Sequence, residues 1–238
     1  MEKSVYLRHI DNENKHWWFK ARREILKSQI KLNCKKRISI LDFGSGSGTN
    51  INMLSDFGKV DVYEKDKTTS NFLKKRYTKK GIKIIKECFS NKKYDLILAA
   101  DVIEHIKNDK KIIKKLHKIL KKDGLIIITV PAYQFLYSKK DDVLKHFRRY
   151  NSVNLKKLFN SKFKIIKLSY YNFLLFIPIT ITIMFFKLFN IQFIDSVEKK
   201  PNNIINTIFY QIFKIEKYIL KYLCLPFGVS ILSIFKKL

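Results

Sequence analysis

The chain has 238 residues, enough for one large α/β domain or for one domain with an appended module. Lysine and arginine outnumber aspartate and glutamate by 49 to 20, which gives a formal charge of +29. This charge indicates an anionic partner, such as a membrane surface or a nucleic acid, or it reflects compositional drift in an AT-rich genome. The three cysteines are sparse, odd in number and without metal-ligand spacing: Cys34, Cys88 and Cys224. This fits a reducing compartment and a fold without a disulfide framework.

The chain begins with a polar segment, residues 1–15, that has no apolar core of signal-peptide length. We therefore expect the catalytic part of the protein to stay in the cytoplasm. A helix is predicted over residues 14–32, and it carries Trp17 and Trp18 with basic side chains between its aromatic ones. This pattern is typical of a helix that packs its aromatic face on the edge of a sheet.

A glycine-rich loop follows the first predicted strand, residues 37–43. Glycine occupies every second position after Phe43: Gly44, Gly46 and Gly48. Glycine accepts positive φ angles and has no Cβ that would hold a ligand away from the backbone. We therefore expect a ligand to contact this loop and the first amides of the next helix, residues 49–57, where the helix dipole favours it.

An acid ends the second predicted strand, residues 59–64. In nucleoside-binding α/β folds, an acid at this place accepts hydrogen bonds from ribose hydroxyls, and Glu64 stands there. The loop is not the dinucleotide fingerprint, because Thr49 occupies the position of the third glycine. The sequence therefore predicts a nucleoside-containing ligand and disfavours a nicotinamide cofactor.

Helices and strands alternate through the middle of the chain. After the second strand we expect a helix at residues 67–79, a short strand at 82–86 and a buried strand at 94–100. A helix at residues 109–123, which ends at Gly124, and a fifth strand at 125–130 come next. A helix at residues 153–160 and a sixth strand at residues 162–170 follow the loop beyond Pro131. This alternation requires a parallel sheet with right-handed crossovers, and it places the glycine loop at the carboxyl edge of the strands.

Several segments together resemble the class I S-adenosylmethionine-dependent methyltransferases, and in particular a bacterial type 11/12-like subgroup often associated with lipid-linked sugar assembly. The segments are HWWFKARREIL from residue 16, LDFGSGSG from residue 41 together with Glu64, DVIEHI from residue 101, HFRRY from residue 146 and LPFGVSIL from residue 225. The resemblance implies an α/β fold with a doubly wound, mostly parallel seven-stranded sheet, an apolar helical insert and an antiparallel last strand. It also implies that the helix at residues 14–32 forms a lid over the cofactor cleft.

The resemblance implies S-adenosyl-L-methionine as the cofactor. The residues expected to bind it are Asp42, Gly44, Ser45, Gly46, Gly48, Glu64, Glu87, Cys88, Asp101 and Val102. Two of these have an alternative role: Asp42 is either near the cofactor's amino group or an acceptor for the loop amides, and Glu87 either accepts from the adenine amino group or is solvated.

Two histidines are the candidate catalytic residues. His105 follows the fourth strand and His146 lies in the loop beyond the fifth, so the two can flank an acceptor hydroxyl and one of them can remove its proton. Alternatively, His105 packs over the cofactor or caps the next helix. Substrate contacts are expected from Trp18, Arg22, Arg148, Arg149 and Tyr150, although the two adjacent arginines also fit a solvated basic turn. No metal site is predicted.

An apolar insert separates the sixth strand from the last. Residues 168–186 are uncharged and just reach the length of a membrane span, whereas residues 203–223 are amphipathic. The insert lies on or re-enters a membrane, is buried within the protein or an oligomer, or crosses a bilayer. The predicted organisation is an N-terminal helical cap (residues 1–36), a cofactor-binding core (37–170), the insert (171–225) and the last strand of the core sheet (226–238).

The sequence thus predicts a methyltransferase that acts on a small-molecule, lipid or lipid-linked glycan acceptor. We expect it to be peripheral or monotopic at the inner face of the cytoplasmic membrane, attracted by its lysines to anionic lipid. A nucleic-acid methyltransferase is the first alternative, but residues 99–102 lack the Asn/Asp-Pro-Pro-aromatic run of enzymes that methylate base amino groups. The second is a non-catalytic membrane-associated subunit that retains the fold.

Overall fold

A seven-stranded sheet forms the centre of the molecule, with the strand order β3-β2-β1-β4-β5-β7-β6. The computed structural model describes residues 12–34, 37–89, 91–189 and 200–238. The strands are β1 (Ile38–Phe43), β2 (Gly58–Tyr63), β3 (Lys83–Ile85), β4 (Tyr94–Ala100), β5 (Leu120–Pro131), β6 (Phe163–Tyr171) and β7 (Ser230–Lys237). The first five are parallel, and β7 runs antiparallel to β5 and β6. This confirms the predicted fold class.

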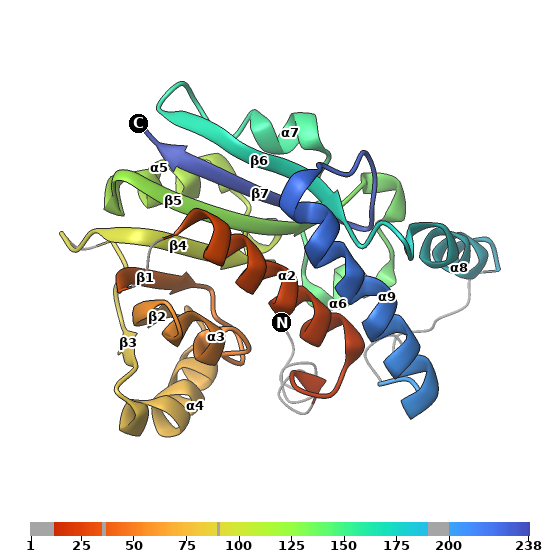
Figure 1. Cartoon of the computed structure of the whole chain (residues 1–238), viewed down its shortest axis with the longest axis horizontal. Coiled ribbons are helices and arrows are strands. Elements are labelled where there is room, and N and C mark those ends of the chain that lie inside the picture. Colours follow the sequence, from red (N-terminus) through yellow and green to blue (C-terminus); the bar gives the residue numbers. More distant parts are fainter. Residues whose placement is uncertain (1–11, 35–36, 90, 190–199) are drawn as a thin grey trace.

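Helices cover both faces of the sheet (Figure 1). They are α2 (Trp17–Asn33), α3 (Ile51–Ser55), α4 (Lys67–Tyr77), α5 (Asp109–Ile119), α6 (Lys139–Leu144), α7 (Ser152–Lys156), α8 (Phe176–Leu188) and α9 (Asn203–Tyr222). Side chains from α2, α3, α4 and α9 share one apolar core with the sheet, and those from α5 and α7 share another. Neighbouring residues of β1 and β4 enter opposite cores because successive side chains of a strand point to opposite faces.

The boundary between α5 and β5 differs from the prediction. The helix ends at Ile119 and the strand starts at Leu120, which pairs with Tyr94 of β4. The register then shifts before Leu96 pairs with Leu125, and Asp123 adopts a positive φ of 61°. Residues 121–124 are therefore an irregular start of the strand, which hydrophobic periodicity alone does not reveal.

The second half of the insert belongs to the helical layer of the sheet. Helix α9 lies beside α2 across one face (Figure 1), and the Trp17 ring contacts that of Phe213 edge-on at a centroid distance of 5.8 Å. Asn206 caps α2 by accepting the amide hydrogen of Trp17 at 2.9 Å, and Gln29 donates to the carbonyl of Leu220 at 3.0 Å. The inner face of α9 is thus buried within the protein, one of the alternatives predicted for the insert.

The first half of the insert, α8, is different because none of its side chains is buried. It projects from the end of β6 at the edge of the molecule (Figure 1). Among the described residues, no helix combines the length and the apolar character needed to cross a membrane. Residues 1–11 of the predicted cap and 190–199 of the predicted insert lie outside the described residues, and the division into four domains stays a prediction.

Candidate active site

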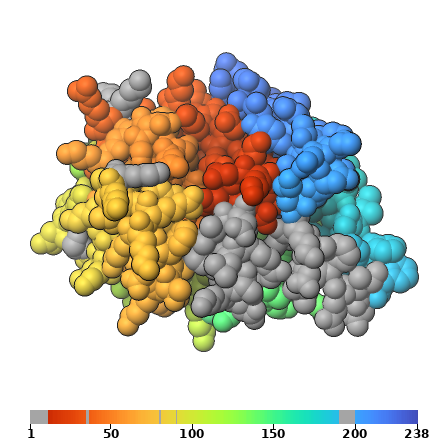
Figure 2. All heavy atoms as spheres, turned by 90° about the horizontal axis from the view of Figure 1, so that it is seen from below, coloured from red at the N-terminus to blue at the C-terminus, as the bar shows by residue number. Residues whose placement is uncertain are grey.

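A pocket of about 1960 Å³ opens at the carboxyl edge of the parallel strands. Its walls come from the loops after β1, β2, β4 and β5, together with α2, α6 and α8. Figure 2 shows the N-terminal part of α2 between α4 on one side and α8 and α9 on the other. Pockets for a single small ligand usually measure about 300–1,000 Å³, so this one has room for a cofactor and a second molecule.

Glycine is needed at the three positions of the loop after β1 for different structural reasons. A Cβ on Gly44 would lie 2.6 Å from Val102, and one on Gly48 would lie 2.8 Å from Leu73, so both glycines allow close packing. Gly46 has a φ of +56° and no atom within 4 Å of a Cβ position. Gly46 and its neighbour Ser45 line the pocket. The loop therefore presents its backbone to a ligand at Gly46.

Glu64 holds the same loop from the end of β2. Its carboxylate accepts the amide hydrogens of Gly46 at 2.9 Å and of Asp66 at 3.0 Å, and its side chain lines the pocket. Aromatic residues stand beside it, because the ring of Phe43 stacks on that of Tyr63 at a centroid distance of 5.5 Å. Open backbone, an acid and flat apolar rings together fit the ribose and adenine of S-adenosylmethionine.

Asp42 is buried below the loop and does not line the pocket. Burial raises its pKa to about 6, although the hydroxyl of Ser45 donates to its carboxylate at 2.6 Å and opposes this rise. Asp42 therefore holds the loop through the side chain of Ser45, whereas the alternative role named above was an acceptor for the loop amides.

Glu87 and Cys88 do not reach the pocket. Strand β3 ends at Ile85, after which Glu87 is exposed and Cys88 enters the core beside Phe43. The next residue, Phe89, lines the pocket instead, and its ring lies 6.2 Å from that of Phe43. The sequence analysis missed Phe89, although an aromatic residue next to the predicted adenine contacts was a signal for it.

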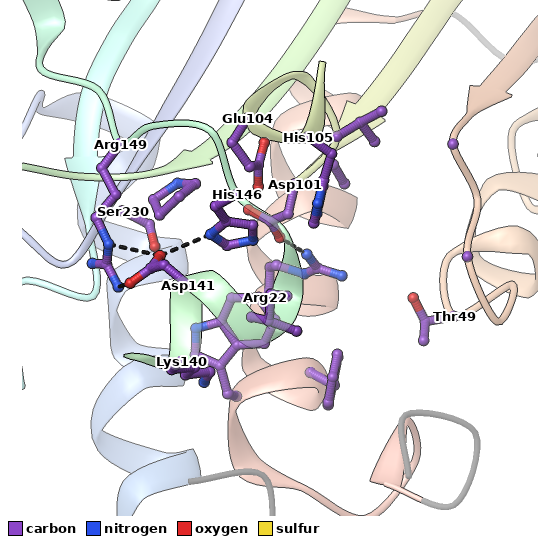
Figure 3. Close-up of a pocket in the computed structure, with 18 of the residues that line it drawn as sticks. Arg22, Thr49, Asp101, Glu104, His105, Lys140, Asp141, His146, Arg149 and Ser230 are labelled. Carbon is purple, nitrogen blue, oxygen red and sulfur yellow. Dashed lines mark hydrogen bonds and ion pairs between the residues drawn. The ribbon is translucent and has the colours of Figure 1, made fainter. Parts of the chain in front are cut away.

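Asp101 and Arg22 form an ion pair at the centre of the pocket (Figure 3). Asp101 has a positive φ of 56° directly after β4, and its carboxylate also accepts from the hydroxyl of Thr129 at 3.1 Å. The guanidinium of Arg22 lies 4.5 Å from the ring centroid of Trp18. The structure thus brings Trp18, Arg22 and Asp101 together, with Val102 next to them on the pocket wall.

The two candidate catalytic histidines are neighbours, with ring centroids 4.5 Å apart. Nδ1 of His146 bonds to Asp141 at 2.7 Å, and Arg149 donates twice to the same carboxylate at 2.9 Å (Figure 3). Burial alone would raise the pKa of Asp141, but His146 and Arg149 hold it well below its usual range. Burial and the His146 ring lower the pKa of His105 to about 4, so His105 is neutral at neutral pH.

Sequence reasoning missed Asp141 and Glu104. Asp141 completes a capping box with Ser138 at the start of α6, and the pattern Ser-x-x-Asp was the signal for it. Glu104 lies in the middle of the DVIEHI segment and is completely buried, and neither carboxylate oxygen has a hydrogen-bond partner. Burial and the nearby charge of Asp101 raise the pKa of Glu104 well above its ordinary value.

Arg148 and Tyr150 do not line the pocket, which corrects the prediction that they contact substrate. The guanidinium of Arg148 donates to Asp109 at 2.6 Å and to the carbonyl of Lys107 at 2.8 Å. The hydroxyl of Tyr150 donates to the same carboxylate at 2.8 Å. Both side chains attach their loop to the start of α5, whereas His146, Phe147 and Arg149 of the same segment line the pocket.

Comparison with known proteins shows the family of this chain. Residues 11–162, more than half of the chain, match the family model described as a methyltransferase domain. An uncharacterized protein of Methanocaldococcus jannaschii, MJ0638, is 29% identical over 153 residues, which are 62% of this chain and 63% of that protein. This chain therefore spans less than two thirds of the length of the curated relative that it matches.

Solved structures share the fold at low sequence identity. A putative methyltransferase from Bacillus halodurans has a TM-score of 0.56 and 16% identity, and the match covers 90% of this chain and 98% of that one. The plantazolicin methyltransferase BpumL in complex with SAH has a TM-score of 0.59 and 14% identity, with coverage of 99% and 90%. Coclaurine N-methyltransferase, bound to N-methylheliamine and SAH, has a TM-score of 0.56 and 16% identity, with coverage of 90% and 72%.

Proposed function

This chain belongs to the methyltransferase domain family. From that premise we propose that it transfers a methyl group to a hydroxyl of an apolar or lipid-linked acceptor. We place the reaction at the cytoplasmic face of a membrane. Its cofactor is S-adenosyl-L-methionine. When bound, that cofactor supplies a methyl group on a sulfonium sulfur, which keeps the electron pair of the broken C–S bond as the acceptor oxygen forms the new O–C bond.

The residues of the glycine loop hold the cofactor. The bare backbone of Gly46 contacts it where any Cβ would intrude, and Glu64 binds the ribose hydroxyls. Phe43, Tyr63 and Phe89 would supply the apolar surface for the adenine. These roles fit the chemistry of the donors, because a carboxylate accepts from hydroxyls and flat rings exclude water from a flat base.

The histidine pair prepares the acceptor. Asp141 holds Nδ1 of His146 as a donor, so Nε2 keeps its lone pair and can take the hydroxyl proton as the O–C bond forms. Arg149 keeps Asp141 in place through two hydrogen bonds. His105 is neutral, so it adds no positive charge that would oppose protonation of its neighbour.

The single observation that carries the membrane assignment is the two-sided helix α8. One side lines the pocket through Pro178, Ile179, Thr182, Ile183 and Phe186. The other side is apolar and exposed, with Ile181 63% and Leu188 79% accessible. A soluble surface rarely leaves such a continuous apolar strip uncovered, and a helix of this kind suits the headgroup–acyl boundary. An apolar acceptor that enters from the bilayer would meet the pocket directly beneath this helix.

Basic residues at the pocket mouth support the same assignment. Lys139 and Lys140 of α6 and Lys187 of α8 line the pocket beside the apolar strip. Each lysine close to an anionic leaflet contributes about 1 kcal/mol of attraction. The excess of basic residues in the whole chain acts in the same direction.

The test is to incubate the purified protein with methyl-labelled S-adenosylmethionine and a membrane preparation of its source organism. We expect label in the lipid extract, and none when the protein carries His146→Ala. Label only in polar small molecules would remove the membrane part of the proposal, and label in RNA would assign the nucleic-acid alternative. No label in any fraction, together with no cofactor binding by calorimetry, would leave a non-catalytic subunit.

A further inference from the structure

The histidine pair has a third partner that the proposed proton transfer does not use. Glu104, His105 and His146 line the pocket together, and one ligand-type atom of each lies within 4.8 Å of the other two. Figure 3 shows the three side chains around one region beside the Arg22–Asp101 pair. In a tetrahedral site with bonds of about 2.1 Å the ligand atoms stand about 3.4 Å apart, so side-chain rotations have to draw these three groups closer together for all of them to reach one ion.

The imidazole of His146 is already oriented as a ligand, because its Nδ1 bonds to the carboxylate of Asp141. In protein metal sites, a coordinating histidine almost always donates its other ring N–H to a carboxylate or a backbone carbonyl, which fixes the tautomer and the direction of the lone pair. The contact between His146 and Asp141 is of this kind, and the ring of His105 packs against that of His146 with centroids 4.5 Å apart.

One carboxyl group beside the site has no partner among the described residues, whereas its two neighbours are paired. Asp101 is paired with Arg22, and Asp141 is paired with Arg149. Glu104 is completely buried and has no cation and no hydrogen bond on either oxygen among the described residues. A buried carboxyl without a partner costs free energy, so such a group in a native site calls for an ion or a ligand that is not part of the chain.

We propose that Glu104, His105 and His146 bind a divalent transition metal ion, of which Zn²⁺ is the best match, at the acceptor side of the pocket. Two imidazoles and one carboxylate suit Zn²⁺, and three protein ligands leave an open coordination position. The ion would occupy Nε2 of His146, so in the metal-loaded protein it would replace the proton transfer to His146 described above: the acceptor oxygen would bind the ion and lose its proton to solvent. This role rests on the proposed function, whereas the binding of the ion does not.

The test is metal binding by the full chain after chelator treatment and dialysis. Titration calorimetry with Zn²⁺ alone should give one site per chain, and Glu104→Gln and His146→Ala should each weaken it by about 100-fold or more. His117→Gln is the matched control, because His117 packs on Phe163 at the far side of α5 and should leave the affinity unchanged. Circular dichroism reports whether each variant is folded.

A second measurement needs no variant. Co²⁺ added to the wild-type chain should give the intense visible absorption of a four- or five-coordinate site, and Zn²⁺ should displace it. A weak, six-coordinate spectrum like that of free Co²⁺, or Zn²⁺ affinity unchanged in both ligand variants, would overturn the inference. Full methyl transfer after chelation would overturn the role of the ion in the reaction and leave the proposed function intact. Tight Zn²⁺ binding without any methyl transfer would instead defeat the proposed function alone.

Discussion

Arg22 of α2 forms an ion pair with Asp101, the residue that directly follows β4. The sequence assigned these two residues to different ligands, Arg22 to the substrate and Asp101 to the cofactor. In the structure they bind each other, and α2 is held over the carboxyl edge of the sheet as a wall of the pocket. The same helix buries Ala21 and Ile25 against the sheet. It therefore both packs on the sheet and covers the pocket.

Removing the Arg22 charge should destabilise the protein. Arg22→Met leaves Asp101 in the pocket without its cation, and we expect a loss of about 2–4 kcal/mol in the free energy of unfolding, measured with urea. Asp101→Asn in the same chain should recover part of the loss. Lys27→Met is the control, since Lys27 pairs with Asp56 on the surface and should change stability by less than about 1 kcal/mol. Equal losses in the two single variants would contradict this account.

The glycines of the loop should separate folding from cofactor binding. Gly48→Ala places a methyl group 2.8–2.9 Å from Leu73, Ile51 and Tyr77, so we expect a clear loss of thermal stability. Gly46→Ala meets no protein atom, and should cost about 1–2 kcal/mol for its positive φ while it weakens S-adenosylmethionine binding at least tenfold. Calorimetry and thermal melts on both variants check this; normal cofactor affinity in Gly46→Ala would refute it.

The histidines should affect turnover and leave the cofactor in place. His105→Ala and His146→Ala are each expected to lower kcat by about 10²–10⁴-fold, because either change removes a group that contacts the acceptor oxygen. The dissociation constant of S-adenosylmethionine should stay nearly constant, since the residues proposed to hold the cofactor are those of the glycine loop, Glu64 and the aromatic rings beside it. His117→Ala should behave as wild type. Unchanged turnover in both variants would remove the pair from the mechanism.

Glu216 should make the stability of the protein depend on pH. It lies on α9, is completely buried, and accepts the amide hydrogens of Asn172, Phe173 and Leu174 at 2.6, 2.7 and 3.1 Å. Burial raises its pKa from 4.5 to about 7, although these hydrogen bonds oppose the rise. The folded chain therefore holds a proton that the unfolded chain releases, and this contribution to stability is complete below about pH 4.5 and lost as the pH rises through about 7.

The measurement is urea unfolding of the wild type and of Glu216→Gln between pH 4.5 and 8. The free energy of unfolding of the wild type, relative to the variant, should fall by about 3 kcal/mol over this range. Comparing the two chains cancels the titration of other groups. A relative stability that rises with pH would show that the three amides keep the carboxylate ionised in the folded state.

The exposed side of α8 should bind anionic lipid. Ile177→Asp with Ile181→Asp removes two side chains worth about 1.5–3 kcal/mol each when fully inserted, so binding to phosphatidylglycerol vesicles should fall by at least tenfold. Val153→Asp on α7 is the control, because Val153 is also exposed and lies away from α8 (Figure 1). Failure of the wild type to bind vesicles, with dimers that the α8 variant abolishes, would assign this face to a second copy of the chain.

The local pattern was sufficient for the fold and for the cofactor loop. Hydrophobic runs with glycine and proline boundaries predicted strands β1 to β7 in the right order, because a buried parallel strand has a continuous apolar sequence. The antiparallel last strand was predicted from the resemblance to known methyltransferases. The boundary at Leu120 was wrong because strand pairing with Tyr94 outweighed the helical periodicity.

The acceptor side of the pocket was only partly predictable. Three features depend on loops that meet only when the sheet has formed: which side chains of HFRRY face the pocket, the pairing of Arg22 with Asp101, and the convergence of Glu104 on the histidines. The sequence by itself determined the elements and the nucleoside-binding loop, because these follow from neighbouring residues, and the resemblance to known methyltransferases supplied the cofactor. Only the tertiary structure decided which charges cancel and which stay unpaired, because that depends on contacts between residues far apart in the chain.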